Sequence, residues 1–180
     1  VDNGANAVYK ALAIATSGGQ TYLYAANFRS GRVEVYNTDY KPVALSGLFT
    51  DFSLPNGYAP FGIQAFGNKL YVTYARQDDQ LHDDLAGRGH GFVDVFNTDG
   101  TAVGRLVSRG ALNSPWGLAI APVGFGRFAG ALIVGNFGDG QINAYDPVSG
   151  THLGTLRGDE RPITIDGLWG LRFGNGTSFG

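Results

Sequence analysis

The chain has 180 residues, of which 16% are charged, and a formal net charge of −2, so it gives no sign of the basic surface that binds nucleic acid or an anionic membrane. It has no cysteine, which excludes disulfides, thiol nucleophiles and zinc–thiolate sites. No apolar run reaches the roughly 20 residues of a membrane span. The 29 glycines and 43% hydrophobic residues favour many short strands joined by tight turns.

The first part of the chain contains three strand-like runs. Val8–Leu12 begins the first run, Tyr22–Ala26 forms the second and Arg32–Tyr36 the third, which ends at a turn over 37–39. Alternating apolar and polar residues bounded by turn residues are typical of half-buried β-strands.

The central and last parts repeat this order. The centre has predicted strands over 61–66, 69–74, 91–96 and 102–107, and the last part has them over 131–135 and 141–145. Residues Trp169–Gly176 then resemble the first run again. We expect them to form the first strand of a further unit.

A short phrase marks the start of three units: a proline or other residue, then an aromatic residue, a glycine and an aliphatic residue, which is residue 63, 118 or 171. A weaker copy without the glycine, Val8–Leu12, ends at position 12, so the steps are 51, 55 and 53 residues. A fixed order of four strands at a period near fifty is typical of propeller blades. A sandwich or barrel, the alternative for short strands, does not need such a phrase. The sequence therefore predicts an all-β propeller.

The predicted blades cover residues 8–59, 60–114 and 115–167, and residues 168–180 start another. Propellers typically have four to eight blades. We therefore expect the chain to be a fragment or a partly resolved product of a larger, six-bladed propeller. The alternative is that two chains complete one ring, and open blade edges could support self-assembly.

Because neighbouring strands of a blade run in opposite directions, strand parity (the odd or even number of a strand in its blade) decides on which side the strand ends. Two kinds of connection therefore lie on the same side of every blade, and we call this side the loop-bearing face. These are the connection between the second and third strands and the connection to the next blade. The long segments fall there: 27–30, 75–90 and 136–139, with the connections near 47–60, 108–115 and 157–167. Binding and catalysis concentrate in loops on a rigid scaffold, so we expect function on this face.

The longest insertion, residues 75–90, holds four carboxylates, two histidines and two arginines. Carboxylates suit Ca²⁺, and histidine beside aspartate suits a transition metal. The spacing is not that of an EF-hand, and the sequence requires no cofactor. The alternative is a solvated loop whose charges keep it soluble. The candidate ligands for a divalent metal are Asp79, His82, Asp83, Asp84 and His90.

Two equivalent turns and two tryptophans supply the candidate ligand-binding residues. Asparagine in such a turn bonds nearby backbone, whereas the charges of Arg29 and Asp139 are not needed there. Trp116 and Trp169 open innermost strands, where they either pack between blades or form a platform for a sugar. The candidates are Asn27, Arg29, Trp116, Asn136, Asp139 and Trp169.

Several runs together resemble an uncharacterised bacterial family of secreted, NHL-like β-propellers. They are Asn3–Ala5, Val8–Lys10, 57–64, 69–75, 91–96, 112–119, 134–140 and 165–169. The resemblance covers essentially the whole chain. It implies a secreted, extracellular or periplasmic protein, a PEP-CTERM sorting signal in some members, and blades missing at both ends of this chain. It implies no activity.

Two functions are expected from these observations. The first is a non-enzymatic, extracytoplasmic propeller that binds a glycan or other polymer, a matrix component or a protein through its loop-bearing face. No G-x-S-x-G elbow occurs, and serine nucleophiles have no evident histidine partner. The alternative is a metal-assisted lyase or hydrolase that uses the insertion at 75–90. A nucleic-acid partner is not expected.

Overall fold

The computed structural model describes residues 6–174 of the chain and confirms the all-β class. Its one described helix is a three-residue turn, η1 (Gly126–Phe128), far too short to cross a membrane. The strands of the described range are β1 (Tyr9–Ser17), β2 (Gln20–Asn27), β3 (Arg32–Tyr36), β4 (Tyr58–Phe66), β5 (Lys69–Arg76), β6 (Gly91–Asn97), β7 (Ala102–Ser108), β8 (Pro115–Ile120), β9 (Leu132–Asn136), β10 (Ile142–Tyr145) and β11 (His152–Thr155).

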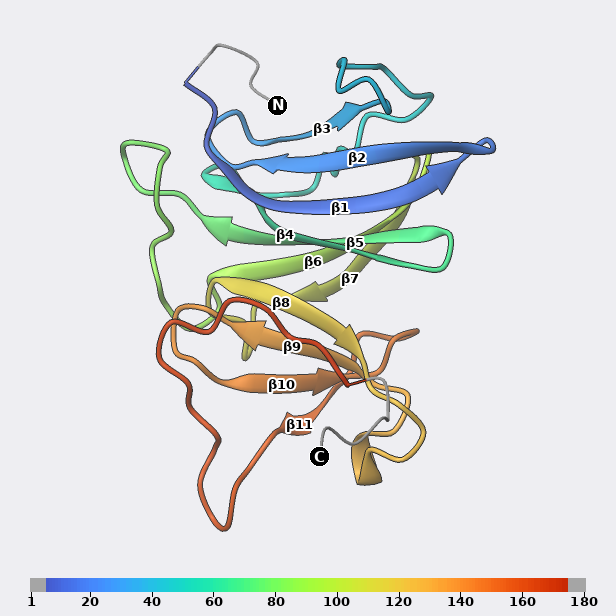
Figure 1. Ribbon diagram of the computed structural model, residues 1–180. Coiled ribbons are helices and arrows are strands. Elements are labelled where there is room, and N and C mark those ends of the chain that lie inside the picture. The colour runs from blue at the N-terminus through green and yellow to red at the C-terminus, as the bar shows by residue number, and fades with distance from the viewer. Residues whose placement is uncertain (1–5, 175–180) are drawn as a thin grey trace.

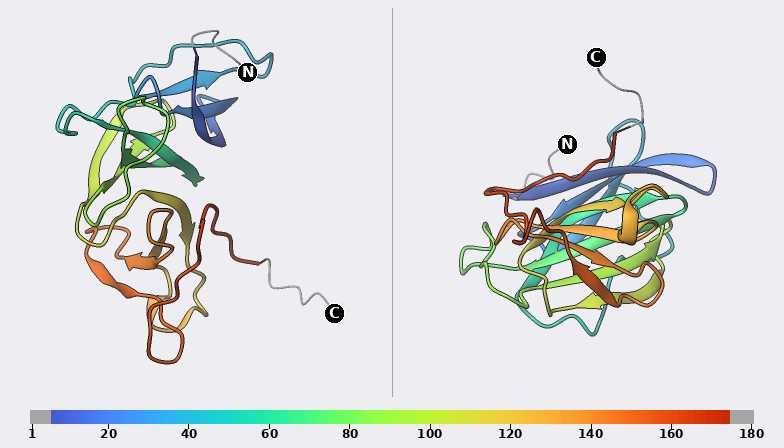
Figure 2. Two further views of the ribbon diagram at one scale, coloured as in Figure 1. Left: turned by 90° about the vertical axis from the view of Figure 1, so that its left-hand side faces the viewer. Right: turned by 90° about the horizontal axis from the view of Figure 1, so that it is seen from below.

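The strands form three antiparallel sheets in which each strand pairs with its neighbours in sequence (Figure 1). The sheets are β1–β2–β3, β4–β5–β6–β7 and β8–β9–β10–β11. They follow one another along an open arc and are not closed into a ring (Figure 2). Because β1 contacts β4 and β4 contacts β8, we call these three the inner strands.

The first sheet has three strands, so the prediction of four strands in every unit is wrong there. After β3 the chain makes only an isolated bridge between Tyr36 and Pro42, and the Val43 amide donates to the Val35 carbonyl over 2.9 Å. Pro42 has no N–H to donate to a ladder. The chain then folds back over the sheet, where Phe49 lies 5.7 Å from both Tyr24 and Phe96.

The predicted strand at Trp169–Gly176 is also absent from the described residues. Residues 168–174 form no strand, and 175–176 lie outside the described range. A strand needs a partner to receive its backbone hydrogen bonds, and no further sheet follows in the described residues. Instead, Leu168 and Leu171 pack on the face of the third sheet that points away from the second sheet, against residues such as Ile133.

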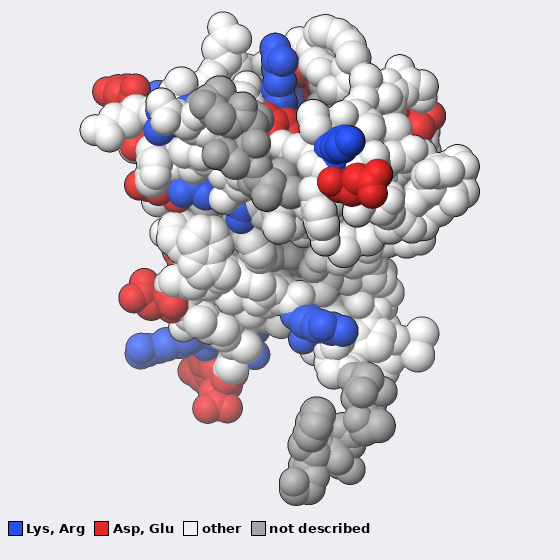
Figure 3. Space-filling view, turned by 45° about the horizontal axis from the view of Figure 1, so that its top comes forward, with Lys and Arg blue, Asp and Glu red and all other residues white. Residues whose placement is uncertain are grey.

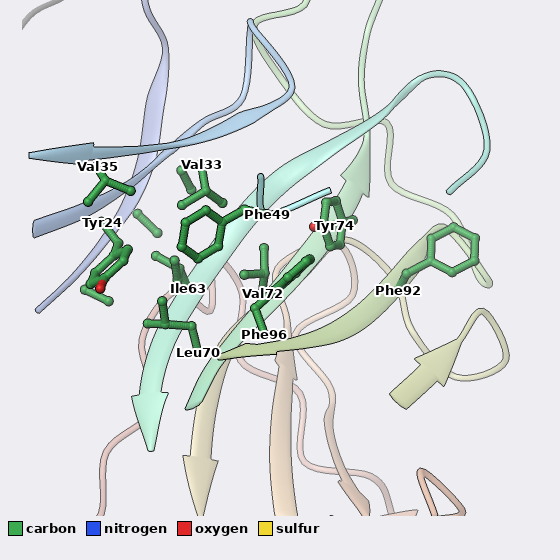
Figure 4. Packing of buried hydrophobic residues seen from close by; sticks show 13 residues of the cluster. Tyr24, Val33, Val35, Phe49, Ile63, Leu70, Val72, Tyr74, Phe92 and Phe96 are labelled. Atoms are coloured by element: carbon green, nitrogen blue, oxygen red, sulfur yellow. The ribbon is translucent and has the colours of Figure 1, made fainter. Parts of the chain in front are cut away.

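Apolar residues on both sides of the second sheet hold the three sheets together. On β6, Phe92 and Phe96 join the cluster shared with the first sheet, whereas Val93 joins the cluster shared with the third. Figure 4 shows the first of these clusters, in which Tyr24 and Val35 face residues of β4, β5 and β6. A fully buried side chain of this size stabilises the fold by about 1.5–3 kcal/mol. The core therefore lies between sheets.

The first sheet has one apolar face that nothing described covers fully. Along β1, Ala11 and Ala13 are buried toward the second sheet, while Leu12 and Ile14 point the other way and are 58% and 68% exposed. Successive side chains of a strand point to opposite faces. The sequence of β1 thus supplies apolar residues to both faces of its sheet.

Two glycines of the repeated phrase lie where another segment approaches the inner strand closely. A Cβ at Gly62 would lie 2.2 Å from the Trp116 carbonyl oxygen, and one at Gly117 would lie 2.7 Å from that of Trp169. Only glycine permits such a backbone approach. Gly170, in the third copy of the phrase, is not crowded, because a Cβ there would meet only the Trp116 ring at 3.7 Å.

Candidate functional site

Each inner strand carries a β-bulge near its start, within the repeated phrase. The pairing register shifts between Tyr9 and Ala11, between Pro60 and Gly62, and between Pro115 and Gly117. The extra residues are Lys10, Phe61 and Trp116. A bulge takes one residue out of the alternation of the strand and re-aims its side chain. All three side chains reach the same group of aromatic rings on the loop-bearing face.

That group, which we call the aromatic cluster, consists of Phe28, Phe61, Trp116, Phe137 and Trp169. The ring centroid of Trp169 lies 4.5 Å from that of Phe137, 5.4 Å from Trp116 and 6.0 Å from Phe61. Phe28 lies 5.3 Å from Phe61. The rings come from all three sheets and the C-terminal segment, so the cluster ties the arc together at the rim.

Exposure increases from the base of the aromatic cluster to its top. Phe28 and Phe61 are fully buried, Trp116 and Phe137 are half-buried, and Trp169 is 43% exposed. Trp116 also donates from Nε1 to the Lys10 carbonyl oxygen over 3.0 Å. Trp116 therefore packs between sheets, which is the first of the two roles considered for it, while Trp169 rests on other rings and stays in contact with solvent.

The two turn asparagines are buried and shape the backbone, as predicted. Asn27 accepts hydrogen bonds from the amides of Val8 (3.3 Å) and Ser30 (3.2 Å), and its Nδ2 donates to Glu34 over 2.8 Å. Asn136 donates from Nδ2 to the Ala111 carbonyl oxygen over 2.8 Å. Burial keeps both side chains away from any ligand on the surface.

The expectation that the turn does not need the charge of Asp139 is wrong. Its Oδ1 accepts hydrogen bonds from Asn136 Nδ2 (3.1 Å) and the Gln141 amide (3.0 Å), and its Oδ2 accepts from Asn113 Nδ2 (3.2 Å). These bonds fix the turn. Arg29 is half-buried, and its Nε has no hydrogen-bond partner among the described residues.

The insertion at 75–90 is folded back on itself like a hairpin. Gln77 and Asp84 form a bridge, the Asp78 amide donates to the Asp83 carbonyl over 2.8 Å, and the Leu85 amide donates to the Arg76 carbonyl over 2.8 Å. Its far part is anchored to the connection between β7 and β8, because the Gly87 amide donates to Asn113 Oδ1 over 2.6 Å. The insertion is thus an ordered wall of the loop-bearing face.

The five candidate metal ligands do not converge. His82 Nδ1 lies 3.0 Å from Asp83 Oδ2, and Asp83 Oδ1 accepts from Lys10 Nζ over 2.8 Å. The bonds from Lys10 and His82 lower the pKa of Asp83. Within residues 6–174, no three His, Asp or Glu side chains gather where they could hold one ion. Metal-assisted chemistry, with Asp79, Asp84 and His90 as further ligands, stays a prediction.

A cleft of about 590 Å³ opens between the insertion and the connection at 55–58. Its lining includes Tyr58, Arg76, Gln77, Asp78, Asp79, His90 and Arg109. His90 is held from behind, because its Nδ1 lies 2.8 Å from the Leu85 carbonyl oxygen. Asp79 and His90, predicted as metal ligands, thus share the cleft with two arginines.

Sequence reasoning missed Arg109, Tyr58 and the role of Arg76. One signal could have found the arginines: Arg76 is the last residue of β5 and Arg109 directly follows β7, so both emerge on the loop-bearing face. That the two arginines line one cleft, however, depends on how β5 and β7 pair with the two sides of β6.

A buried ionic cluster lies away from this face, on β6 and β7. Arg105 donates from Nε to Asp94 Oδ1 over 2.5 Å and also pairs with Asp51. Asp94 is 1% exposed, and its Oδ2 has no partner among the described residues. Burial raises the pKa of Asp94 to about 7, although Arg105 opposes the shift. The cluster fastens the segment around Asp51 to the second sheet.

Charged side chains are dispersed over the surface. On the face shown in Figure 3, Lys and Arg side chains lie among Asp and Glu side chains, without an extended patch of one sign. Recognition on such a surface depends on local geometry more than on a long-range field.

No family model matches the sequence. Two uncharacterised proteins of Acanthamoeba polyphaga mimivirus are similar to it. One is 39% identical over 170 residues, which cover 91% of this chain and 41% of the relative. The other is 35% identical over 173 residues, which cover 93% of this chain and 45% of the relative. The chain thus spans less than half the length of these relatives.

Two solved structures resemble the fold at low sequence identity. A protein of unknown function from Bacteroides caccae matches 97% of this chain and 52% of its own, with a TM-score of 0.56 and 9% identity. The glutaminyl cyclase of Myxococcus xanthus matches 86% of this chain and 54% of its own, with a TM-score of 0.50 and 16% identity. At these identities the likeness concerns the fold alone.

Proposed function

We propose that the chain is an arc of a six-bladed, NHL-like β-propeller whose loop-bearing face binds a polysaccharide outside the cytoplasm. Three observations support the propeller. The sheets follow one another in chain order, each begins with its inner strand, and neighbouring sheets pack face to face. The exposed apolar face around Leu12 and Ile14 is the place for a preceding blade.

The observation that carries the binding function is the exposed indole of Trp169. Phe137, Trp116 and Phe61 fix its position from below, and 43% of the residue remains accessible. A rigid aromatic face loses little conformational entropy on binding, and sugar rings present apolar C–H faces that stack on such surfaces. A flat, preorganised ring on the loop-bearing face therefore favours a saccharide.

The test is binding of oligosaccharides to the wild type and to Trp169→Ala, measured by calorimetry. The panel includes neutral and charged hexasaccharides, among them the hexamer of α-1,4-linked galacturonic acid and its full methyl ester. We expect binding that falls at least about tenfold in Trp169→Ala, equivalent to about 1.4 kcal/mol, and that is partly restored in Trp169→Phe. Native mass spectrometry of the same material separates one longer chain from two copies completing a ring.

A matched control is Tyr40→Ala. Tyr40 is 68% exposed but lies in the turn after β3, remote from the aromatic cluster. It should bind like the wild type. Equal affinity of Trp169→Ala and wild type would overturn the proposal, as would binding of proteins alone with no saccharide bound.

A further inference from the structure

The cleft beside the insertion differs chemically from the aromatic cluster. It is lined by two arginines, Arg76 and Arg109, together with the ring of Tyr58 and the carboxylates of Asp78 and Asp79. Neither arginine forms a side-chain hydrogen bond or an ion pair with any residue in 6–174. Their donors are therefore available to a ligand.

Arg109 is held in place although it lacks an ionic partner. Its guanidinium carbon lies 5.3 Å from the Phe92 ring centroid and 5.9 Å from that of Tyr58. The two rings pack edge to face at 4.8 Å. A cation near ring faces is attracted by their quadrupoles, and a guanidinium that keeps its N–H groups free is suited to bidentate contact with a carboxylate.

The backbone at Arg109 supports this reading. Arg109 has φ = +56°, a left-handed conformation that is uncommon for a residue other than glycine. Its amide donates to the Gly91 carbonyl over 2.8 Å, and its carbonyl accepts from the Leu112 amide over 3.0 Å. These two bonds fix the backbone that carries the Arg109 side chain at the cleft.

The mixture of charges defines the ligand class. A polyanion with several charges on each ring would be repelled by Asp78 and Asp79, while a neutral sugar would leave both arginines unused. A saccharide with one carboxylate per ring satisfies both groups, since its carboxylate binds a guanidinium and its hydroxyls donate to an aspartate. Asp78 already accepts from the His82 amide through Oδ1 over 2.8 Å, which holds that side chain in a fixed orientation.

The cleft is connected to the aromatic cluster through Gln77. Its Nε2 donates to the Phe28 carbonyl over 2.6 Å, and its amide donates to the Gly57 carbonyl over 2.8 Å. Gln77, which lines the cleft, thus touches the base of the aromatic cluster, and both features belong to the loop-bearing face. Resting on the proposed function, we infer that the ligand is a uronic acid polysaccharide whose carboxylate binds Arg109 and Arg76 in the cleft.

The experiment compares Arg109→Gln with wild type against the galacturonic acid hexamer and its methyl ester, which has the same rings without the charge. We expect wild type to prefer the acid, with a preference that weakens as salt rises. Arg109→Gln should lose at least about tenfold in affinity for the acid, as for a hydrogen bond to a charged group, and little for the ester. Arg109→Lys should retain part of the preference.

The matched control is Arg127→Gln, because Arg127 also stacks on a ring, 4.5 Å from the Phe128 centroid, but in η1. It should bind like wild type. Circular dichroism and thermal unfolding verify that each variant is folded. Equal binding of acid and ester, unaffected by Arg109→Gln but lost in Trp169→Ala, would overturn this inference and leave the proposed function standing. Arg109-dependent binding of an acidic peptide but of no saccharide would overturn both.

Discussion

The indole Nε1 of Trp116 donates a hydrogen bond of 3.0 Å to the backbone carbonyl oxygen of Lys10. Both residues are the extra residues of β-bulges, one in the third sheet and one in the first. The bond therefore joins the first and third sheets directly, beside β4, the inner strand of the second sheet. The two bulges thus help to fix the curvature of the arc.

Trp116→Phe should lower the free energy of unfolding by about 1 kcal/mol, because it removes this hydrogen bond and keeps an aromatic ring. Urea denaturation followed by circular dichroism measures the change. Trp169→Phe is the matched control, since no hydrogen bond from its indole occurs within the described residues, and it should change stability by less than about 0.5 kcal/mol. Equal losses in both variants would show that ring packing alone matters.

Gly62→Ala should destabilise the fold by about 2 kcal/mol or more, since its Cβ would lie 2.2 Å from the Trp116 carbonyl oxygen, a backbone atom that cannot move without shifting the third sheet. Thermal unfolding measures the effect. Gly124→Ala, where no atom lies within 4 Å of the added Cβ, should be close to neutral. A stable Gly62→Ala variant would mean that the inner strands are not held this closely.

Asp94 should make stability depend on pH. Its pKa is about 7 in the folded protein and about 4 in an unfolded chain, so the folded state holds the proton more tightly. The free energy of unfolding should therefore fall as pH rises from about 4 to 7, by up to about 4 kcal/mol. Urea denaturation across this range measures the slope.

Asp94→Asn should flatten that slope, because asparagine does not titrate, and Arg105 keeps its pairing with Asp51. Asp146→Asn changes a turn aspartate whose pKa is lowered by hydrogen bonds from the amides of Ser149 and Val148. Its own effect on stability therefore lies below about pH 4, and it should leave the contribution of Asp94 intact. If Asp94→Asn has the same pH profile as wild type, Asp94 is ionised throughout the range.

Asn113→Ala should loosen the insertion at 75–90. It removes the acceptor of the Gly87 amide, and a loss of about 1 kcal/mol raises the locally open population about fivefold. Limited trypsinolysis after Arg88, followed by mass spectrometry, measures the cleavage rate. Asn68→Ala, in the exposed turn between β4 and β5, serves as control. If Asn113→Ala is cleaved at the same rate as wild type, other contacts hold the insertion in place.

Local signals predicted most of the strands. Alternation and the turn after Tyr36 predicted β3 with the bounds that the structure has, and the turn Gly67-Asn68 placed the hairpin of β4 and β5. The lack of a fourth strand in the first sheet was not predictable in the same way. Pro42 has no N–H to donate to a ladder, but the course of the chain after it depends on the packing of Phe49 between sheets.

The site was predicted less completely than the fold. Strand parity correctly placed Trp116 at the rim, because Trp116 lies near the start of β8 as predicted. Trp169 reaches the same rim through ring contacts of a segment that forms no strand. The hydrogen bonds of Asp139 and the cleft around Arg109 depend on contacts between segments far apart in sequence, such as the bond from Asn113 to Asp139. No local pattern encodes such distances.

Two close approaches along the inner side of the arc are made by backbone, at Gly62 against the Trp116 carbonyl and at Gly117 against the Trp169 carbonyl. Main-chain contacts of this kind do not depend on the side chains that a unit carries on its loops. The loops of neighbouring units can therefore diverge in sequence without disturbing these two contacts.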